Sequence, residues 1–163
     1  MPAVELLCLT PEIVTELVEN RFEAAHPFTL GELHPLVTDV AEHTERFRRA
    51  KDAPPAWCGY LAFDAEERFV VGTCAFKGVP DAEGVVEIAY FTFPMYERRG
   101  YATAMATELI RRARLEPDVR RMCAHTAPET NASTRLLERL GFVFFGPVDD
   151  PEDGPIWRWE QPW

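Results

Sequence analysis

The chain has 163 residues, a length that suits one domain burying roughly 70% of the surface its unfolded chain would expose. Its 27 acidic and 17 basic residues give a net charge of −10, which opposes nucleic-acid binding and favours a cationic small molecule or peptide, although it serves solubility equally well. No apolar run approaches the roughly 18 residues of a membrane span, and no leader pattern is present. A cytoplasmic protein without membrane contact is therefore expected.

The cysteines and histidines do not predict a metal site. The cysteines are widely spaced among apolar residues, without a Cys-x-x-Cys pair, and we interpret them as reduced core thiols. They are Cys8, Cys58, Cys74 and Cys123. The histidines His26, His34 and His43 are scattered and form no ligand set with His125.

The first 52 residues predict a strand followed by two helices. Residues 4–9 are a short apolar run, after which Thr10 can cap a helix and Pro11 can occupy its first position. His26 and Pro27 are expected to end that helix. Side chains at helical spacing predict a second helix that stops before residues 52–55. They are Leu33, Leu36, Val37, Val40, Ala41, Thr44 and Phe47.

Between residues 57 and 93 the apolar period changes to that of strands. Three β-rich runs are separated by turn-like segments at 64–68 and 78–84, which predicts an antiparallel meander. An amphipathic helix follows Gly100, and its apolar face is expected to be Ala102, Met105, Ala106, Leu109, Ile110 and Ala113. Residues 122–126 then predict a strand parallel to its predecessor, because a helix connects the two.

The last forty or so residues predict a short helix and a hairpin. Residues 128–131 open the helix, its leucines face inward, and Gly141 is expected at its C′ position. Runs at 142–145 and 156–160 predict a hairpin across residues 149–154. The aromatic tail, residues 157–163, is a candidate contact in a homodimer.

The turn before the amphipathic helix is a candidate anion site. First-turn N–H groups lack intrahelical partners, and glycine lets a phosphate approach them and widens the range of φ. Arg98 and Arg99 add positive charge, and Arg111, Arg112 and Arg114 are expected to lie beside the same site. The alternative is an ordinary loop glycine before a helix.

Glu87 is a carboxylate in an otherwise apolar strand, where an unpaired charge is costly. In a regular strand it shares a face with Val85, Ala89, Phe91 and Phe93, so a local cleft is needed there. A structural carboxylate bound to the backbone or to an arginine is the alternative to a catalytic one.

Two motifs resemble those of the GNAT N-acetyltransferases over residues 57–160. The segment E-R-R-G-Y-A resembles the acetyl-CoA signature Q/R-x-x-G-x-G/A, with Gly100 and Ala102 on the small positions and Glu97 as a departure. The segment T-N-A-S-T-R-L-L-E-R-L-G-F is similar to the second motif of the ribosomal-protein-alanine acetyltransferase branch. It matches Ser133 to the motif's serine but places the asparagine one residue late, at Asn131. Leu137 replaces a tyrosine that is the acid in many relatives.

The resemblance implies an α+β GNAT fold, with a mixed, mostly antiparallel seven-stranded sheet and helices on both faces, as one N-acetyltransferase domain over residues 1–163. Residues 57–160 would bind acetyl-CoA and residues 1–52 would shape the acceptor pocket. The implied reaction is direct acetyl transfer to a primary amine of a small molecule or peptide N-terminus, without a metal. Glu87 would be the general base, through water, and Ser133 would bind the CoA sulfur. The implied cofactor-binding residues are Phe91, Thr92, Phe93, Arg98, Arg99, Gly100, Tyr101, Ala102, Thr103, Asn131 and Ser133.

Several alternatives remain open from the sequence. A serine early in a helix is more often a cap, which is the alternative role for Ser133. Tyr90 and Tyr101 are further possible donors to a thiolate, and His125 either faces the substrate or is structural. An inactive acyl-CoA-binding module is consistent with Leu137 and Glu97. An anion-binding structural domain without CoA is a third reading. The sequence does not identify the acceptor amine or the oligomeric state.

Overall fold

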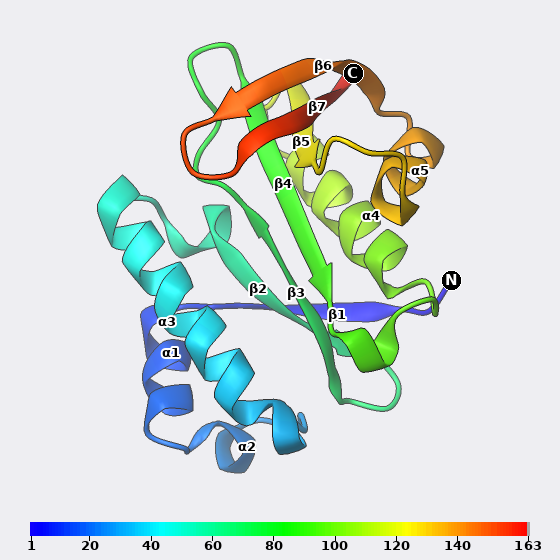
Figure 1. The fold of residues 1–163 in the computed structure, drawn as a ribbon. Helices are drawn as coiled ribbons and strands as arrows, with labels where there is room; N and C mark the ends of the chain where they lie inside the picture. The colour runs from blue at the N-terminus through cyan, green and yellow to red at the C-terminus, as the bar shows by residue number, and fades with distance from the viewer. Residues whose placement is uncertain (163) are drawn as a thin grey trace.

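The computed structural model describes residues 1–162 and contains one seven-stranded sheet in the order β1-β2-β3-β4-β5-β7-β6 (Figure 1). The strands are β1 Val4–Cys8, β2 Gly59–Asp64, β3 Val70–Phe76, β4 Val85–Thr92, β5 Arg121–Thr126, β6 Val143–Asp150 and β7 Gly154–Pro162. The α-helices are α1 Pro11–Val18, α2 Phe22–Ala25, α3 His34–Lys51, α4 Tyr101–Arg114 and α5 Ala132–Arg139. The pair β4–β5 is parallel, and the other neighbouring pairs are antiparallel. The predicted mixed α+β architecture is confirmed.

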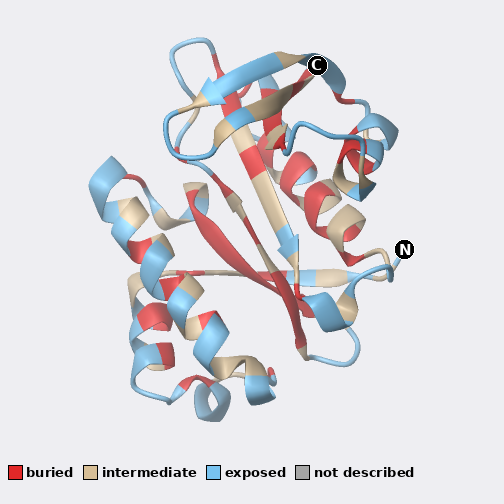
Figure 2. Cartoon of the chain, viewed as in Figure 1, coloured by how far each residue is buried: buried red, intermediate tan, exposed pale blue. Residues whose placement is uncertain are grey.

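The sheet separates two apolar cores. On one face, Met105 and Leu109 of α4 pack over the strands together with Leu137 of α5. On the other face, helices α1 and α3 contribute Leu17 and Val37, among others, to a second core. Figure 2 shows buried residues concentrated in the central strands and on the sides of the helices that face them. In Figure 1, α1 to α3 lie to the left of the sheet and α4 and α5 to its right.

Strands β4 and β5 separate soon after they pair. Their register covers three positions, ending where Glu87 lies opposite Cys123. Strand β4 continues to Thr92 and β5 to Thr126, so both run on beyond the paired part. Figure 1 shows β4 continuing away from β5 toward the start of α4. The edge of β4 that faces β5 is therefore open after Glu87.

Most predicted boundaries are confirmed, and the main difference is the end of the first helix. The Thr10 hydroxyl accepts a hydrogen bond from the Ile13 N–H, and Pro11 begins α1, as predicted. Helix α1 nevertheless ends at Val18, well before the predicted stop at His26 and Pro27. Asn20 takes a φ of 57°, which breaks the helix, and the short α2 follows.

The aromatic tail is part of the sheet instead of a free contact surface. It forms β7, which pairs with β5 on one side and β6 on the other. Trp159 is 3% exposed, and its indole N–H donates to the Thr126 hydroxyl at 3.0 Å. Trp163, at the end of the predicted dimer contact, lies outside the described residues. None of the helices in residues 1–162 has the length and apolar character needed to cross a membrane.

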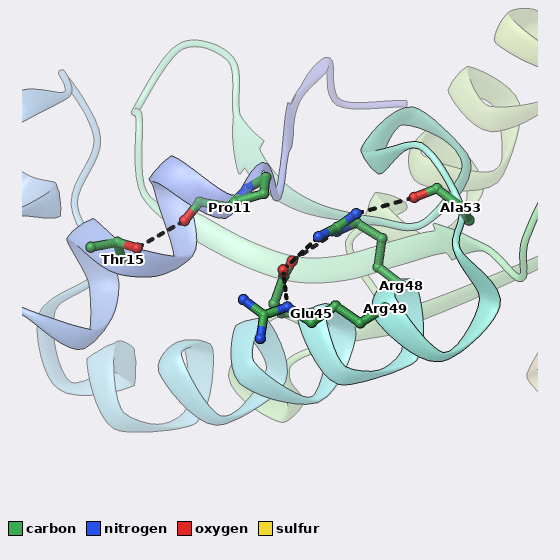
Figure 3. A network of polar contacts seen from close by, with 6 residues as sticks. All are labelled: Pro11, Thr15, Glu45, Arg48, Arg49 and Ala53. Carbon is green, nitrogen blue, oxygen red and sulfur yellow. Dashed lines mark hydrogen bonds and ion pairs between the residues drawn. The ribbon is translucent and has the colours of Figure 1, made fainter.

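A buried carboxylate holds the C-terminal end of α3 (Figure 3). Glu45 is 8% exposed and accepts hydrogen bonds from Arg48 at 2.7 and 2.9 Å and from Arg49 at 3.0 Å. Arg48 also donates to the carbonyl of Ala53, just past the helix, at 3.4 Å. The hydrogen bond from Arg48 lowers the pKa of Glu45, although burial opposes this shift. The network fixes α3 against the chain that leads into β2.

Replacing Glu45 by glutamine should lower the free energy of unfolding by about 1–3 kcal/mol at pH 7, because the partly buried Arg48 loses its charged partner. The folded-state pKa of Glu45 lies below its unfolded value of 4.5. Its contribution is thus present above about pH 4.5 and lost as the pH falls further. Urea denaturation at pH 7 and pH 3.5 measures both effects. The exposed Glu42 on the same helix provides the control, Glu42→Gln, and an equal deficit at both pH values would contradict the assignment.

Candidate active site

The open edge of β4 presents the main chain of Tyr90 and Thr92. The Glu87 carbonyl accepts a main-chain hydrogen bond of 2.9 Å from the end of β3, and the Phe93 N–H donates one of 2.9 Å to β3. Residues of a strand alternate between the two sides in the direction of their main-chain groups. Tyr90 and Thr92 therefore turn their N–H and C=O groups toward the side that β5 has left. An extended ligand can pair with such an edge as an added strand.

Among the described residues, the side chain of Thr92 also lacks a hydrogen-bond partner, like the main-chain groups of the open edge. Its Oγ1 atom is buried and has no hydrogen-bond partner among residues 1–162. A buried hydroxyl without a partner costs about 1–3 kcal/mol. An amide-bearing chain laid along this edge would satisfy it. These observations fit the extended, amide-containing pantetheine arm of CoA.

Of the two phenylalanines predicted to bind the cofactor, Phe93 is buried and Phe91 is exposed. Phe93 is 0% exposed in the core beneath α1 and α3, and its N–H is bound to β3. Neither its side chain nor its N–H is free for a cofactor. Phe91 is 51% exposed and lies on the same face of β4 as Glu87.

The turn before α4 has the geometry of an anion site. Gly100 is the N-cap residue with a φ of 88°, and no side chain caps the helix. Arg98 and Arg99 are exposed beside it, and the Arg99 guanidinium lies 5.7 Å from the centre of the Tyr96 ring. A Cβ added to Gly100 would lie 2.9 Å from Cδ of Pro2. The φ of Gly100 and this contact with the N-terminus both favour glycine at this position.

Tyr101 is a packing residue, which removes one of the predicted thiolate donors. Its side chain is 6% exposed, and its hydroxyl donates to Asp64 Oδ2 at 2.7 Å. Burial and this hydrogen bond raise the pKa of Tyr101 to about 12. Its main-chain N–H, with those of Ala102 and Thr103, remains at the start of α4.

The predicted cluster of five arginines does not form. Arg111, Arg112 and Arg114 lie in the last turn of α4, about 15 Å or more from its start at 1.5 Å per residue. Arg111 and Arg112 bind Glu108 at 2.8 and 2.9 Å, and hydrogen bonds from Arg111 and Arg112 lower the pKa of Glu108 to about 2. Arg98 and Arg99 are left beside the turn.

Glu87 and His125 bridge the separating strands on the face that carries α3. Val86 and Ile88 point into the core beneath α4, so Glu87 points to the opposite face. His125 Nδ1 lies 2.9 Å from Glu87 Oε2, and Lys77 Nζ lies 3.4 Å from the same oxygen. Within residues 1–162, the groups that contact this carboxylate directly are therefore a histidine and a lysine, instead of the arginine or backbone groups of the structural alternative.

A cavity of about 410 Å³ adjoins this pair. Glu87, His125 and Lys77 line it together with Asp150 and Asp153 from the β6–β7 hairpin. The side chains of Glu87 and His125 are 23% and 17% exposed, so both are shielded yet reachable. The cleft expected beside Glu87 is present, and its hairpin side is acidic.

Cys123 completes a group of three possible metal ligands that the sequence spacing did not reveal. Its thiol, Glu87 and His125 place their ligand atoms within 4.8 Å of one another. Burial raises the pKa of Cys123 to about 11, so the thiol is protonated at neutral pH when no metal is bound. Lys77 adds a positive charge beside the group. The arrangement fits an acid–base pair better than a metal centre.

Tyr90 of β4 and Ser133 of α5 form a second contact, on the face that carries α4 and α5. The two hydroxyl oxygens are 3.0 Å apart. Asn131 caps α5 by accepting a hydrogen bond of 3.0 Å from the Thr134 N–H, so Ser133 is not needed as the cap. Leu137, in the position of the family's tyrosine, is 0% exposed. Sequence reasoning missed this pairing, since nothing in the spacing of residues 90 and 133 indicates it.

Comparison with known proteins agrees with the fold. A family model described as an acetyltransferase (GNAT) domain matches residues 6–143. An uncharacterized N-acetyltransferase, YjdG of Bacillus subtilis (strain 168), is 35% identical over 74 residues, which span 45% of this chain and 44% of that protein. The chain thus matches less than half of this relative's length.

Solved structures of low identity share the same fold. A putative ribosomal-protein-serine acetyltransferase from Vibrio cholerae superposes with a TM-score of 0.69 at 18% identity, over 99% of this chain and 95% of that one. RimL, a ribosomal L7/L12 α-N-protein acetyltransferase in complex with coenzyme A, gives 0.66 at 14% identity, over 98% and 94%. The family model spans most of the sequence, and the chain therefore belongs to the acetyltransferase (GNAT) domain family.

Proposed function

We propose that the protein transfers the acetyl group of acetyl-CoA to a primary amine of a small molecule or a peptide N-terminus by direct attack. The observation that carries the proposal is the open edge of β4, with its unpartnered Thr92 hydroxyl. This edge leads from the bridge between Glu87 and His125 toward the start of α4. The coenzyme A bound to the structurally similar RimL supports the choice of cofactor.

The residues present fit acetyl-CoA as co-substrate. The main chain of Tyr90 and Thr92 would pair with pantetheine. The N–H groups of Tyr101, Ala102 and Thr103 would hold the pyrophosphate, where the helix dipole contributes roughly 0.3–2 kcal/mol. Arg98 and Arg99 would add positive charge there, although neither has a fixed ion pair among the described residues.

On the other face, Glu87 would accept the proton that the amine must lose. Reference pKa values are about 7.7–8.0 for an α-amine and 10.4 for lysine, so an acceptor amine is mostly protonated at pH 7. A positioned base contributes about 10²- to 10⁴-fold to the rate. His125 holds the carboxylate in place at 2.9 Å. Asp150 and Asp153 make the same cavity attractive to a cation.

The proposal is tested by incubating the purified chain with labelled acetyl-CoA and a panel of diamines, amino sugars and short peptides. The expected result is labelled acetylated amine with release of CoA in equal amounts. In parallel, CoA is expected to raise the melting temperature, because a ligand that binds the native state alone stabilises it. The absence of both effects would favour an anion-binding structural domain.

A second candidate is an acyl-CoA-binding module without chemistry. The observation that favours it is Leu137, which is fully buried where many relatives have a tyrosine. This candidate predicts a thermal shift with CoA and no turnover with any amine. The same two measurements therefore distinguish all three readings.

A further inference from the structure

Strand β4 makes one side-chain contact on each face of the sheet where it parts from β5, one to His125 of β5 and one to Ser133 of α5. Glu87 and His125 form the contact on the α3 face at 2.9 Å. Tyr90 and Ser133 form the contact on the face of α4 and α5 at 3.0 Å. A thioester lying on the open edge of β4 would have a proton acceptor on one side and two hydroxyl groups on the other.

The two hydroxyl groups are 3.0 Å apart, and either of them can donate the hydrogen bond. Burial raises the pKa of Tyr90, and the hydrogen bond with Ser133 only partly opposes this shift, so the phenol remains protonated at neutral pH. A hydroxyl has one hydrogen to donate. When Ser133 Oγ accepts the hydrogen of Tyr90, the hydrogen of Ser133 must point elsewhere. Asn131 already binds the N–H of Thr134, so capping of α5 does not require the Ser133 hydroxyl.

We propose that Tyr90 is a positioning residue, which donates its hydroxyl to Ser133 Oγ and directs the Ser133 hydrogen at the sulfur of the thioester. This inference rests on the proposed function. It supplies a donor to the departing sulfur in a chain that has the apolar, buried Leu137 at the usual position of the acid. The donor thus comes from α5 and is oriented from β4.

These groups account for every bond and proton in the acetyl transfer. The amine nitrogen forms a bond to the carbonyl carbon, the carbon–sulfur bond breaks, and its electron pair leaves on the sulfur. The protonated amine first gives one proton to Glu87, which passes it to water, and after the attack the nitrogen loses a second proton to water by the same route. The thiolate is held by the Ser133 hydroxyl and takes one proton from water. Tyr90 keeps its own proton throughout.

The test is Tyr90→Phe in the full chain, which removes one hydroxyl and keeps the ring. The first readout is the pKa of the thiol of bound CoA, followed by the ultraviolet absorbance of the thiolate and independent of any amine. This pKa should rise by about one unit, and kcat should fall about tenfold with little change in KM for acetyl-CoA. The matched control is Tyr60→Phe, whose hydroxyl donates to the Ala56 carbonyl at 2.7 Å and should leave both values unchanged.

A double-mutant cycle separates positioning from a general structural effect. Ser133→Ala should reduce kcat about as much as Tyr90→Phe, and adding Tyr90→Phe to Ser133→Ala should cost nothing more. The inference would be overturned if the kcat losses of the two single variants multiplied in the double variant. It would also be overturned if Tyr90→Phe left the thiol pKa unchanged. A thiol pKa that responds to Tyr90→Phe in a protein without turnover would refute the proposed function and still support the role of Tyr90.

Discussion

Replacing Glu87 by glutamine is expected to lower kcat by about 10²- to 10⁴-fold, while the KM for acetyl-CoA stays within about threefold. Glutamine keeps the size of the side chain and a hydrogen bond to His125, but it cannot take a proton from the amine. The main chain of Tyr90 and Thr92, which would bind the cofactor, is unaffected. Steady-state kinetics across the pH range measure both parameters. Calorimetric titration with CoA checks that the affinity is retained.

Glu160→Gln is the matched control for this change. Glu160 also lies opposite Cys123 in the sheet, and it binds Arg158 at 2.9 Å and Arg121 at 3.4 Å. The Glu160→Gln substitution removes one negative charge from the same face of the sheet, but Glu160 does not line the cavity beside Glu87. Its kcat should stay within about threefold of the wild-type value. An unchanged kcat in Glu87→Gln at every pH would exclude Glu87 as the base.

The fold was predictable wherever apolar periodicity and turn chemistry agreed. The spacing that predicted α3 and the inward face of α4 is confirmed by the burial of Val37, Ala41, Met105 and Leu109. The end of α1 was not predictable in this way. Asn20 adopts a left-handed conformation that asparagine tolerates but does not require. The following stretch continues with ordinary helix-forming residues, so the proline at 27 was the stronger signal.

The candidate site was predictable as a set of strands and turns, but not as a set of contacts. A helical crossover places the strands of Glu87 and His125 side by side, and the sequence indicated this much. Their contact at 2.9 Å depends on a register of three residues, after which the strands part. The contact between Tyr90 and Ser133 depends on the same separation, for which the sequence carries no local signal. The predicted arginine cluster was wrong because the prediction did not take the length of α4 into account. Its last-turn arginines lie at the far end of the helix from Arg98 and Arg99.

Replacing Gly100 by alanine is expected to weaken CoA binding by about 10- to 100-fold. The residue has a φ of 88°, and an added Cβ would lie 2.9 Å from Cδ of Pro2. To relieve the unfavourable φ and the close contact with Pro2, the first turn of α4 would have to move, which would misalign its N–H groups. Loss of one hydrogen bond to a charged phosphate costs about 1.5–3 kcal/mol, which corresponds to this range. The KM for acetyl-CoA should rise, whereas kcat at saturation should change little.

Gly78→Ala separates the loss of the anion site from backbone strain. Gly78 has a φ of 99°, and an added Cβ would have no atom within 4 Å. The left-handed conformation should cost each variant about 1–2 kcal/mol of stability, measured by urea denaturation, but Gly78→Ala should bind CoA normally. Adding Pro2→Ala to Gly100→Ala removes the contact and keeps the strain, so binding should recover in part. If Gly100→Ala alone binds CoA as tightly as wild type, the pyrophosphate must lie elsewhere than the start of α4.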